Sequence, residues 1–358
     1  GRLVPLPAEW SLEAKADYVI GNFSLFLLWL MALCLALTAA LARAEWATAR
    51  VWSHRPAATA GLGLFGLTVA FALIVGVNYP LVAADIAFKL GQSSDNRQDW
   101  RSSIVFYTKA VARQPDQDHY RLFLGRALLE SARQTADPTA REALLQRTEE
   151  TLLRARELNP LNTDHSANLA RYYATVAALS DDPAARRIAL EQASTYYAQA
   201  TTLSPNTAHL QNEWGTVLVQ LGRYDEARAR FERSLQLDPN FADTYLRRAQ
   251  LESQLGNWAA ALADYEEATR LAPNDIRGHS GRAYALAQLG RVDEAIAANQ
   301  AILQLNPDEF STLQNLALLY DMQGDKVQAL MYARRARTVA PPAQQPLLDE
   351  LIRRLESN

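Results

Sequence analysis

Histidines and adjacent acidic residues are the side chains of this sequence that could carry chemistry. The five histidines are His54, His119, His165, His209 and His279. None has a partner at metal-ligand spacing, and His119, His165 and His209 recur near the start of repeated units, so we interpret them as structural. The adjacent acids are Glu149-Glu150, Asp181-Asp182 and Glu266-Glu267. Neighbouring residues of a helix point in different directions, so these pairs do not predict a catalytic dyad.

Three glycines match a nucleotide-binding pattern. Gly61, Gly63 and Gly66 spell GxGxxG, a pattern that binds a dinucleotide only where it joins a strand to a helix. Here the glycines stand inside a long uncharged stretch, where small residues serve close helix packing. The single cysteine, Cys34, excludes an intrachain disulfide and a cysteine-based metal site. We therefore expect no cofactor, no metal and no catalytic residue, and the chain is not predicted to be an enzyme.

The charge distribution does not favour nucleic acid as a partner. The formal net charge of the chain is −3, and the part beyond residue 84 has 31 Lys and Arg against 35 Asp and Glu. A nucleic-acid-binding domain shows a basic footprint instead. That part of the chain is also rich in Ala, Leu, Arg, Glu and Gln, which is typical of long helices.

Two uncharged stretches near the N-terminus predict transmembrane helices in contact with lipid. The first covers residues 23–42. The second covers residues 57–84, and its spanning part is expected at 57–77, before Asn78 and Pro80. About 20 apolar residues in a helix span the hydrocarbon core of a bilayer. The sequence therefore predicts a two-helix anchor within residues 23–84, preceded by an N-terminal segment at 1–22.

The loop between the two stretches predicts the orientation of the anchor. Residues 43–56 contain Arg43, Arg50 and Arg55 but only one acid, Glu45, and an excess of arginine marks a cytoplasmic loop. Residues 1–22 and all residues after 84 are then extracytoplasmic, on the periplasmic or outer face of a bacterial inner membrane. The chain begins with Gly1 and not with Met, which we interpret as a processed N-terminus or a fragment of a longer protein.

Beyond residue 84 three residue types recur every 34 residues. The prolines are Pro205, Pro239, Pro273, Pro307 and Pro341; the glycines are Gly222, Gly256, Gly290 and Gly324; the alanines are Ala227, Ala261, Ala295 and Ala329. Each unit predicts a helix, a turn at the glycine, a second helix packed closely at the alanine, and a stop at the proline. One such helix pair cannot bury its apolar face, so consecutive pairs must stack.

Two further units precede these with a longer period. Pro115 and Pro160 are 45 residues apart, and so are Pro160 and Pro205. We place the eleven additional residues around 134–143 and 180–188, where Asp137-Pro138 and Asp182-Pro183 mark turns. The sequence therefore predicts about seven repeats.

The repeated residues resemble those of the tetratricopeptide-repeat family. The matching positions are Leu90, Gly91, Tyr107, Ala110 and Pro115 in the first repeat, Trp214, Gly215, Ala227, Phe231 and Pro239 in the fourth, and Ala249, Ala261, Tyr265, Ala268 and Pro273 in the fifth. Asn299 and Ala333 depart from the pattern in the sixth and seventh repeats, where we expect looser packing. The resemblance implies an all-α, right-handed solenoid of helix-turn-helix repeats over residues 84–341.

A final helix is predicted at residues 342–358. Leu347, Leu348, Leu351 and Leu355 form one apolar stripe along it. Such a helix resembles the capping helix that protects the last repeat of these arrays from water.

The resemblance also implies where a ligand binds. In this family the first helices of the repeats line a concave groove that holds partner proteins. The polar residues at matching positions are Arg126, Arg171, Asn212, Thr216, Arg247, Gln250, Tyr284 and Gln314. They can equally be solvated residues of a helix surface. The Lys and Asn pattern that clamps a peptide's C-terminal carboxylate in some members is absent, so that ligand is not predicted.

Two functions remain open at this stage. The first is a membrane-anchored scaffold that binds a partner protein, itself in or near the membrane, at the extracytoplasmic face. The alternative is the C-terminal region of a glycan enzyme of the O-antigen ligase or polymerase type, because residues 84–130 resemble the junction between membrane helices and repeats in such enzymes. Its catalytic part would then lie upstream of Gly1.

Overall fold

The computed structural model of the chain describes residues 79–357 and isolated positions before them, namely 14, 17, 18, 20–22, 25, 29, 32, 33, 36, 39, 40 and 66. Apart from those isolated positions, the predicted transmembrane runs at 23–42 and 57–77 and the loop at 43–56 lie outside the described residues. Among the helices that are described, none has the length and apolar character needed to cross a membrane.

Residues 79–357 are all-α, as predicted. They form fifteen α-helices and one short 3-10 helix, with no strand in this range. The chain divides into two compact units, residues 1–179 and 180–358. The third predicted repeat falls across this division, and the right-handed course predicted for the whole array stays a prediction.

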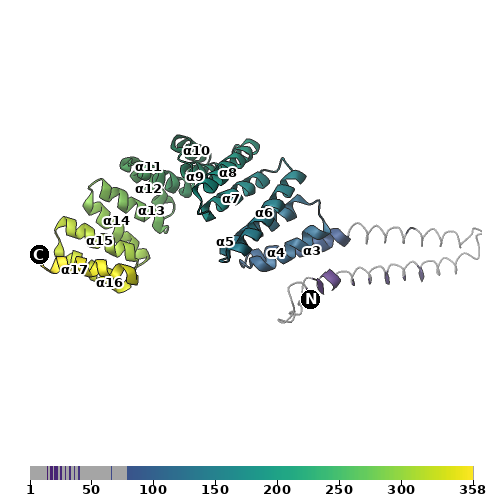
Figure 1. Cartoon of the computed structure of the whole chain (residues 1–358), viewed down its shortest axis with the longest axis horizontal. Coiled ribbons are helices and arrows are strands. Elements are labelled where there is room, and N and C mark those ends of the chain that lie inside the picture. The colour runs from purple at the N-terminus through teal and green to yellow at the C-terminus, as the bar shows by residue number, and fades with distance from the viewer. Residues whose placement is uncertain are drawn as a thin grey trace, which may run out of the picture. The chain divides into compact units, whose positions relative to one another are not determined.

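The first unit contains five of these helices (Figure 1). They are α3 (Tyr79–Asp95), α4 (Trp100–Arg113), α5 (Asp118–Gln134), α6 (Pro138–Leu158) and α7 (Thr163–Leu179). Each helix packs on the next, and α5 also contacts α7, so that the first helices of successive pairs lie against each other.

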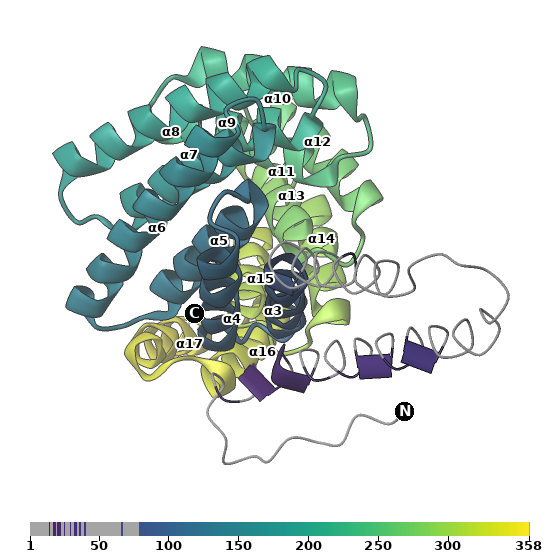
Figure 2. The same ribbon diagram turned by 90° about the vertical axis from the view of Figure 1, so that its right-hand side faces the viewer.

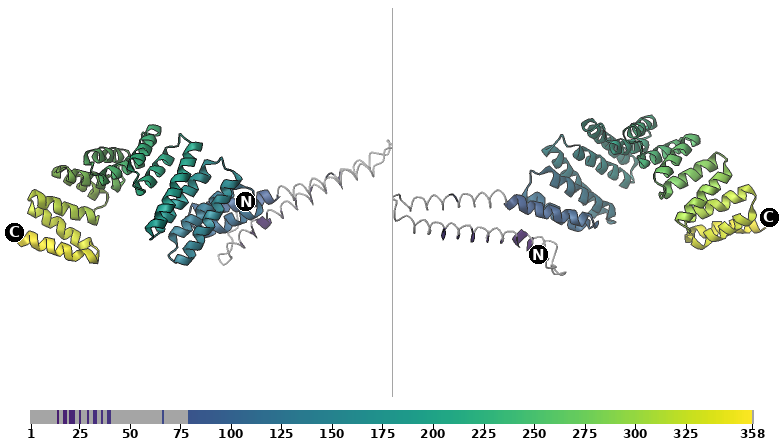
Figure 3. Two further views of the ribbon diagram at one scale, coloured as in Figure 1. Left: turned by 45° about the horizontal axis from the view of Figure 1, so that its top comes forward. Right: turned by 180° about the vertical axis from the view of Figure 1, so that it is seen from behind.

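The second unit continues the same pattern (Figures 2 and 3). Its helices are α8 (Pro183–Leu203), α9 (Ala208–Gln220), α10 (Tyr224–Leu237), α11 (Ala242–Gln254), α12 (Trp258–Leu271), α13 (Ile276–Gln288), α14 (Val292–Leu305), α15 (Phe310–Gln323), α16 (Lys326–Val339), the 3-10 helix η3 (Pro342–Gln344) and α17 (Gln345–Ser357). Within this unit α9 contacts α11, and α11 contacts α13.

Helix lengths explain the longer period of the early repeats. The first helices α5 and α7 have 17 residues, whereas α9, α11 and α13 have 13. The second helices α6 and α8 have 21 residues, whereas α10, α12 and α14 have 14. The eleven additional residues therefore add about one turn to each first helix and two turns to each second helix, next to the predicted turns.

The periodic glycines occupy the turns predicted for them. Gly222, Gly256, Gly290 and Gly324 have φ angles of 75°, 79°, 74° and 84°. At the first of these turns the amide of Arg223 donates to the carbonyl oxygen of Leu218 at 2.9 Å, which closes the end of α9. The left-handed conformation costs a residue with a Cβ atom free energy, so glycine is favoured here.

A second set of glycines makes room for aromatic rings. A Cβ atom added at Gly215 would lie 2.6 Å from a ring carbon of Phe231, and one added at Gly91 would lie 2.4 Å from Tyr107. Both rings are fully buried. These contacts join the two helices of one pair, and they give the tetratricopeptide-like pattern of glycine and aromatic residues its physical reason.

The departures from the pattern are also buried. Asn299 is 2% exposed and its side-chain amide donates to the carbonyl oxygen of Ala295 at 2.8 Å, and Ala333 is fully buried. The looser packing expected there stays a prediction. At the C-terminus α17 packs on α16 through Leu348 and Leu355, within the segment predicted to cap the array.

Candidate functional site

The eight predicted groove residues all lie on the first helices of their repeats. Arg126 is on α5, Arg171 on α7, Asn212 and Thr216 on α9, Arg247 and Gln250 on α11, Tyr284 on α13 and Gln314 on α15. Two hollows, one in each unit, are lined by five of these residues.

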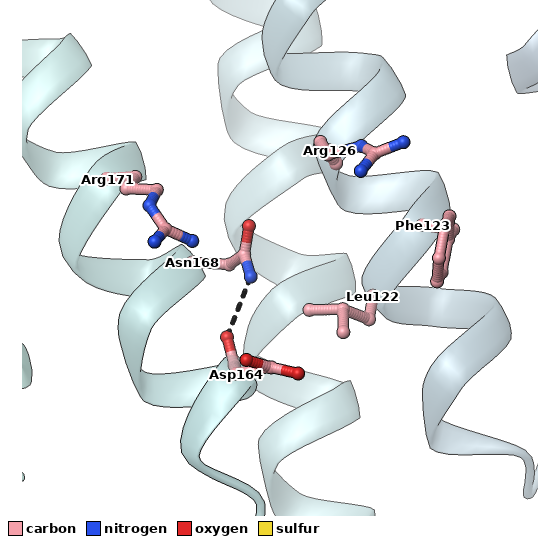
Figure 4. Close-up of a pocket in the computed structure, with 6 residues that line it drawn as sticks. All are labelled: Leu122, Phe123, Arg126, Asp164, Asn168 and Arg171. Carbon is pink, nitrogen blue, oxygen red and sulfur yellow. Dashed lines mark hydrogen bonds between the residues drawn. The ribbon is translucent and has the colours of Figure 1, made fainter. Parts of the chain in front are cut away.

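The hollow in the first unit lies between α5 and α7 and has a volume of about 230 Å³. Six side chains line it: Leu122, Phe123 and Arg126 from α5, and Asp164, Asn168 and Arg171 from α7. Figure 4 shows the guanidinium groups of Arg126 and Arg171 near one end and the carboxylate of Asp164 at the other, with Asn168 between them. The hollow therefore combines cations, an amide, an anion and an apolar wall.

The guanidinium of Arg126 is held in place by Asp95 and by the ring of Phe123. Its Nη2 donates to Oδ2 of Asp95 at 2.6 Å, and the same oxygen accepts the phenolic proton of Tyr107 at 2.8 Å. The Asp95 side chain is 6% exposed, and the guanidinium also lies over the ring of Phe123, 4.9 Å from its centre. An arginine fixed in this way loses little conformational entropy when it binds a further group.

The buried carboxylate of Asp95 also affects the pKa of Tyr107. Burial and the hydrogen bond to Asp95 raise the pKa of Tyr107 well above its ordinary value. The phenol therefore stays protonated and remains a donor to Asp95. Oδ1 of Asp95 is buried and has no hydrogen-bond partner among the described residues.

Polar contacts set the spacing of α5 and α7. Arg133 on α5 donates to the hydroxyl of Thr175 on α7 at 2.6 Å. At the other end of the helices Nε2 of His165, which is fully buried, lies 2.7 Å from Oδ2 of Asp118. These contacts fix the width of the hollow at both ends, and the histidine has the structural role that the sequence predicted.

The pKa of Asp118 is changed by its burial and by this pairing. Burial alone would raise the pKa of Asp118, but hydrogen bonds from His165 and Asn159 outweigh burial and bring that pKa below its ordinary value of 3.8. The ionised carboxylate is therefore the form that joins the first turns of α5 and α7.

The hollow in the second unit lies between α9 and α11 and measures about 220 Å³. Its polar lining is Thr216, Gln220, Arg247, Gln250 and Gln254, and its apolar lining is Val219, Phe231 and Leu251. Arg247 lies 3.5 Å from Asp243. This hollow presents mainly amides, in contrast to the charged lining between α5 and α7.

The remaining predicted residues do not line either hollow. Asn212 is 4% exposed, and its amide donates to Oδ2 of Asp243 at 2.9 Å, which joins α9 to α11. Tyr284 is 55% exposed, with its ring edge-on to Trp258 at 5.4 Å between centres. Gln314 is half-buried on α15.

Sequence reasoning missed several residues of the first hollow. Leu122, Phe123, Asp164 and Asn168 line it, and Asp95 supports it from α3. A signal for the α7 residues was available, because Asn168 and Asp164 stand one and two turns before Arg171 and so share its helix face. No comparable signal marks Asp95, whose partners come from α4 and α5.

Comparisons with known proteins agree with this architecture. The sequence profile of the family described as tetratricopeptide repeat matches residues 212–276 and 246–310, which supports this family for the chain. Among curated protein sequences none matches.

Solved structures show the same fold. The structure titled as the functional characterization of Pseudomonas aeruginosa PilF has a TM-score of 0.51 and 18% identity, covering 66% of this chain and 98% of that one. The Cut9–Hcn1 structure, a hetero-tetramer of the APC/C, has a TM-score of 0.51 and 15% identity, covering 82% of this chain and 52% of that one. Similarity at these identities shows the fold alone, a stack of helical repeats.

Proposed function

We propose that this chain is a membrane-anchored interaction protein that binds a segment of a partner protein on the first-helix face of its repeats, beginning with the hollow between α5 and α7. The observation that carries the proposal is the fixed guanidinium of Arg126, which lines that hollow together with Arg171. Repeat proteins of this fold offer extended surfaces to partners. The described residues contain no group of three or more His, Cys, Asp or Glu placed to hold a metal ion.

The lining of the hollow specifies the chemistry of the bound segment. Within the described part of the chain, Arg126 donates to Asp95 through Nη2, which leaves its other N–H groups for a carboxylate. Guanidinium groups bind carboxylates through paired hydrogen bonds. Leu122 and Phe123 offer apolar contact, and Asp164 at the other end favours a donor or a cation. We expect a partner segment in which an acidic side chain and a basic or amide side chain flank an apolar residue.

Membrane anchoring is the second part of the proposal. It rests on the uncharged runs at 23–42 and 57–77 and on the arginine-rich loop at 43–56. With that loop in the cytoplasm, the repeats lie on the periplasmic side of a bacterial inner membrane. No flexible Gly/Ser linker separates the second run from α3, which begins at Tyr79, so we expect the partner to be membrane-bound or close to the membrane.

Matched arginine substitutions test the binding surface. Arg171→Gln removes a charge from the hollow, whereas Arg154→Gln removes one from the exposed face of α6, where Arg154 pairs with Glu157. We expect proteins that co-purify with the full chain from detergent-solubilised native membranes to be reduced at least about tenfold by the first change and unaffected by the second. Equal retention by both variants would contradict the proposed surface.

Protease accessibility tests the anchor separately. Protease added to spheroplasts should digest residues after 85 and leave the loop at 43–56 intact. Protection of the repeats would reverse the orientation without affecting the binding proposal. The alternative of a glycan ligase or polymerase stays a prediction, which the gene sequence upstream of Gly1 tests: further transmembrane helices favour the enzyme, and a start codon or signal peptide favours the scaffold.

A further inference from the structure

Two residues near the N-terminus contact the first helix pair of the array. Asp17 and Ile20 are both in helical conformation, and residues three apart on a helix face the same side. Oδ1 of Asp17 lies 2.7 Å from Nζ of Lys109 and 4.0 Å from Nη2 of Arg113, both on α4. Asp17 therefore pairs with the first helix pair through α4.

The apolar half of this contact is buried. Ile20 is 3% exposed and belongs to one cluster with Ala83, Ala84 and Ala87 of α3, Ala110 of α4 and Tyr120 of α5. The four alanines are fully buried, and Tyr120 is 1% exposed. Alanine side chains are small, and the larger residues Ile20 and Tyr120 of the same cluster shield them from water.

The position of the contact shows what it does for the array. Among the described residues no repeat precedes the first helix pair, so the face of α3 and α4 that would meet a preceding repeat can take another segment. At the other end α17 covers α16 through Leu348 and Leu355. Terminal faces of repeat arrays have to be covered by something other than a repeat.

We propose that the N-terminal segment carrying Asp17 and Ile20 is the N-terminal cap of the array. Ile20 makes its apolar contact with α3 and α4, and Asp17 forms an ion pair with Lys109. Tyr79, where α3 begins, packs against the same cluster. The chain therefore reaches the first repeat at two points, before and after residues 23–78, and both ends of that stretch are held at one face.

This attachment has a consequence for the anchor, which rests on the proposed function. If residues 23–78 cross the bilayer, they leave and return at the same face of α3 and α4, so the array is tied to the membrane by two chain segments and not by one. A flexible insertion beside Tyr79 would then not free the array by itself. The capping contact, however, is a property of the chain whether or not a membrane is present.

Zero-length cross-linking tests the contact directly. A carbodiimide joins a carboxylate to an amine that touches it, and the chain has only four lysines, Lys15, Lys89, Lys109 and Lys326. In the full chain in detergent we expect a covalent Asp17–Lys109 product, identified by mass spectrometry and lost in Lys109→Gln. A product that links Lys109 to other carboxylates and never to Asp17 would overturn the proposal.

Hydrogen exchange tests the capping role. Ile20→Ala should raise the exchange rates of amides in α3 and α4 by roughly 50-fold, because it removes about three buried methyl or methylene groups. The exchange rates in α15 and α16 should not change. Asn22→Ala is the matched control, because Asn22 is exposed in the same segment, and it should change these rates less than about threefold. Unchanged protection of α3 and α4 in Ile20→Ala would refute the cap, and unchanged rates in α15 and α16 confirm that the array itself is folded.

Discussion

Substituting Gly215 with alanine should destabilise the protein, and the same substitution should stabilise it once Phe231 has been removed. The new Cβ atom would lie 2.6, 2.8 and 3.0 Å from three atoms of the Phe231 ring. The ring is fully buried, so it cannot swing into solvent, and either the ring or α10 must shift. The contact lies inside one helix pair, between α9 and α10.

The magnitudes follow from packing and from helix propensity. Overpacking by one methyl group costs about 1–3 kcal/mol, whereas alanine is favoured over glycine inside a helix by about 0.5–1 kcal/mol. Gly215→Ala alone should therefore destabilise by about 1–2 kcal/mol, and Phe231→Ala alone by about 3–5 kcal/mol. In the Phe231→Ala background the clash is gone, so Gly215→Ala should stabilise by about 0.5–1 kcal/mol.

Hydrogen exchange on the full chain in detergent measures the stability effects of Gly215→Ala and Phe231→Ala, alone and combined, at the helices concerned. Amides of α9 and α10 report the change, and amides of α15 and α16 serve as an internal reference because each repeat contacts mainly its neighbours. The control is Ala249→Gly, at the equivalent position of the next repeat, where the structure already accommodates an alanine that is fully buried. Additivity of the two substitutions within about 0.5 kcal/mol would refute the packing argument.

Three further outcomes are expected. Gly222→Ala should cost about 1–2 kcal/mol in a thermal or denaturant melt, because φ is 75° there and no steric clash contributes; an unchanged melt would contradict the role of the turn. The pKa of Asp118 is held below 3.8 by its hydrogen bonds, so its contribution to stability is present above that pH and is lost as the pH falls through the lowered pKa; Asp118→Asn should abolish this part of the acid dependence of denaturant melts. Glu252→Ala should cost about 1–3 kcal/mol in the same melts, because the carboxylate is 7% exposed and its removal leaves Arg228 and Asn257 without their hydrogen-bond acceptor; a loss below about 0.5 kcal/mol would show that the pair is not structural.

The sequence predicted most of the local structure of the repeats because each local feature repeats in phase. The 34-residue spacing of Gly222 and its counterparts required one turn per unit, and each turn has the left-handed glycine expected of it. The lengthened early repeats were placed correctly as well, since Asp137-Pro138 and Asp182-Pro183 mark the starts of α6 and α8, where each aspartate accepts hydrogen bonds from the first turn.

Contacts between helices were harder to predict. The aromatic position of the repeat does not predict which glycine its ring contacts: the ring of Phe231 lies close to Gly215 in its own repeat, and the ring of Tyr265 lies close to Gly281 in the next repeat. The candidate site shows the same limit. The period placed Arg126 and Arg171 on first helices, but it could not indicate that Asp95 holds Arg126, because that contact depends on how three helices pack.

Site-specific photo-cross-linking in native membranes tests the central claim, that the hollow between α5 and α7 is a binding surface for another protein. A photoreactive benzoyl-phenylalanine replaces Asn168 in the hollow or, as a control, Glu157, whose side chain is 64% exposed on α6. We predict a discrete cross-linked adduct from position 168 that is absent from position 157 and is lost when Arg171→Gln is added. An adduct of equal yield from both positions, or from position 157 alone, would contradict the account.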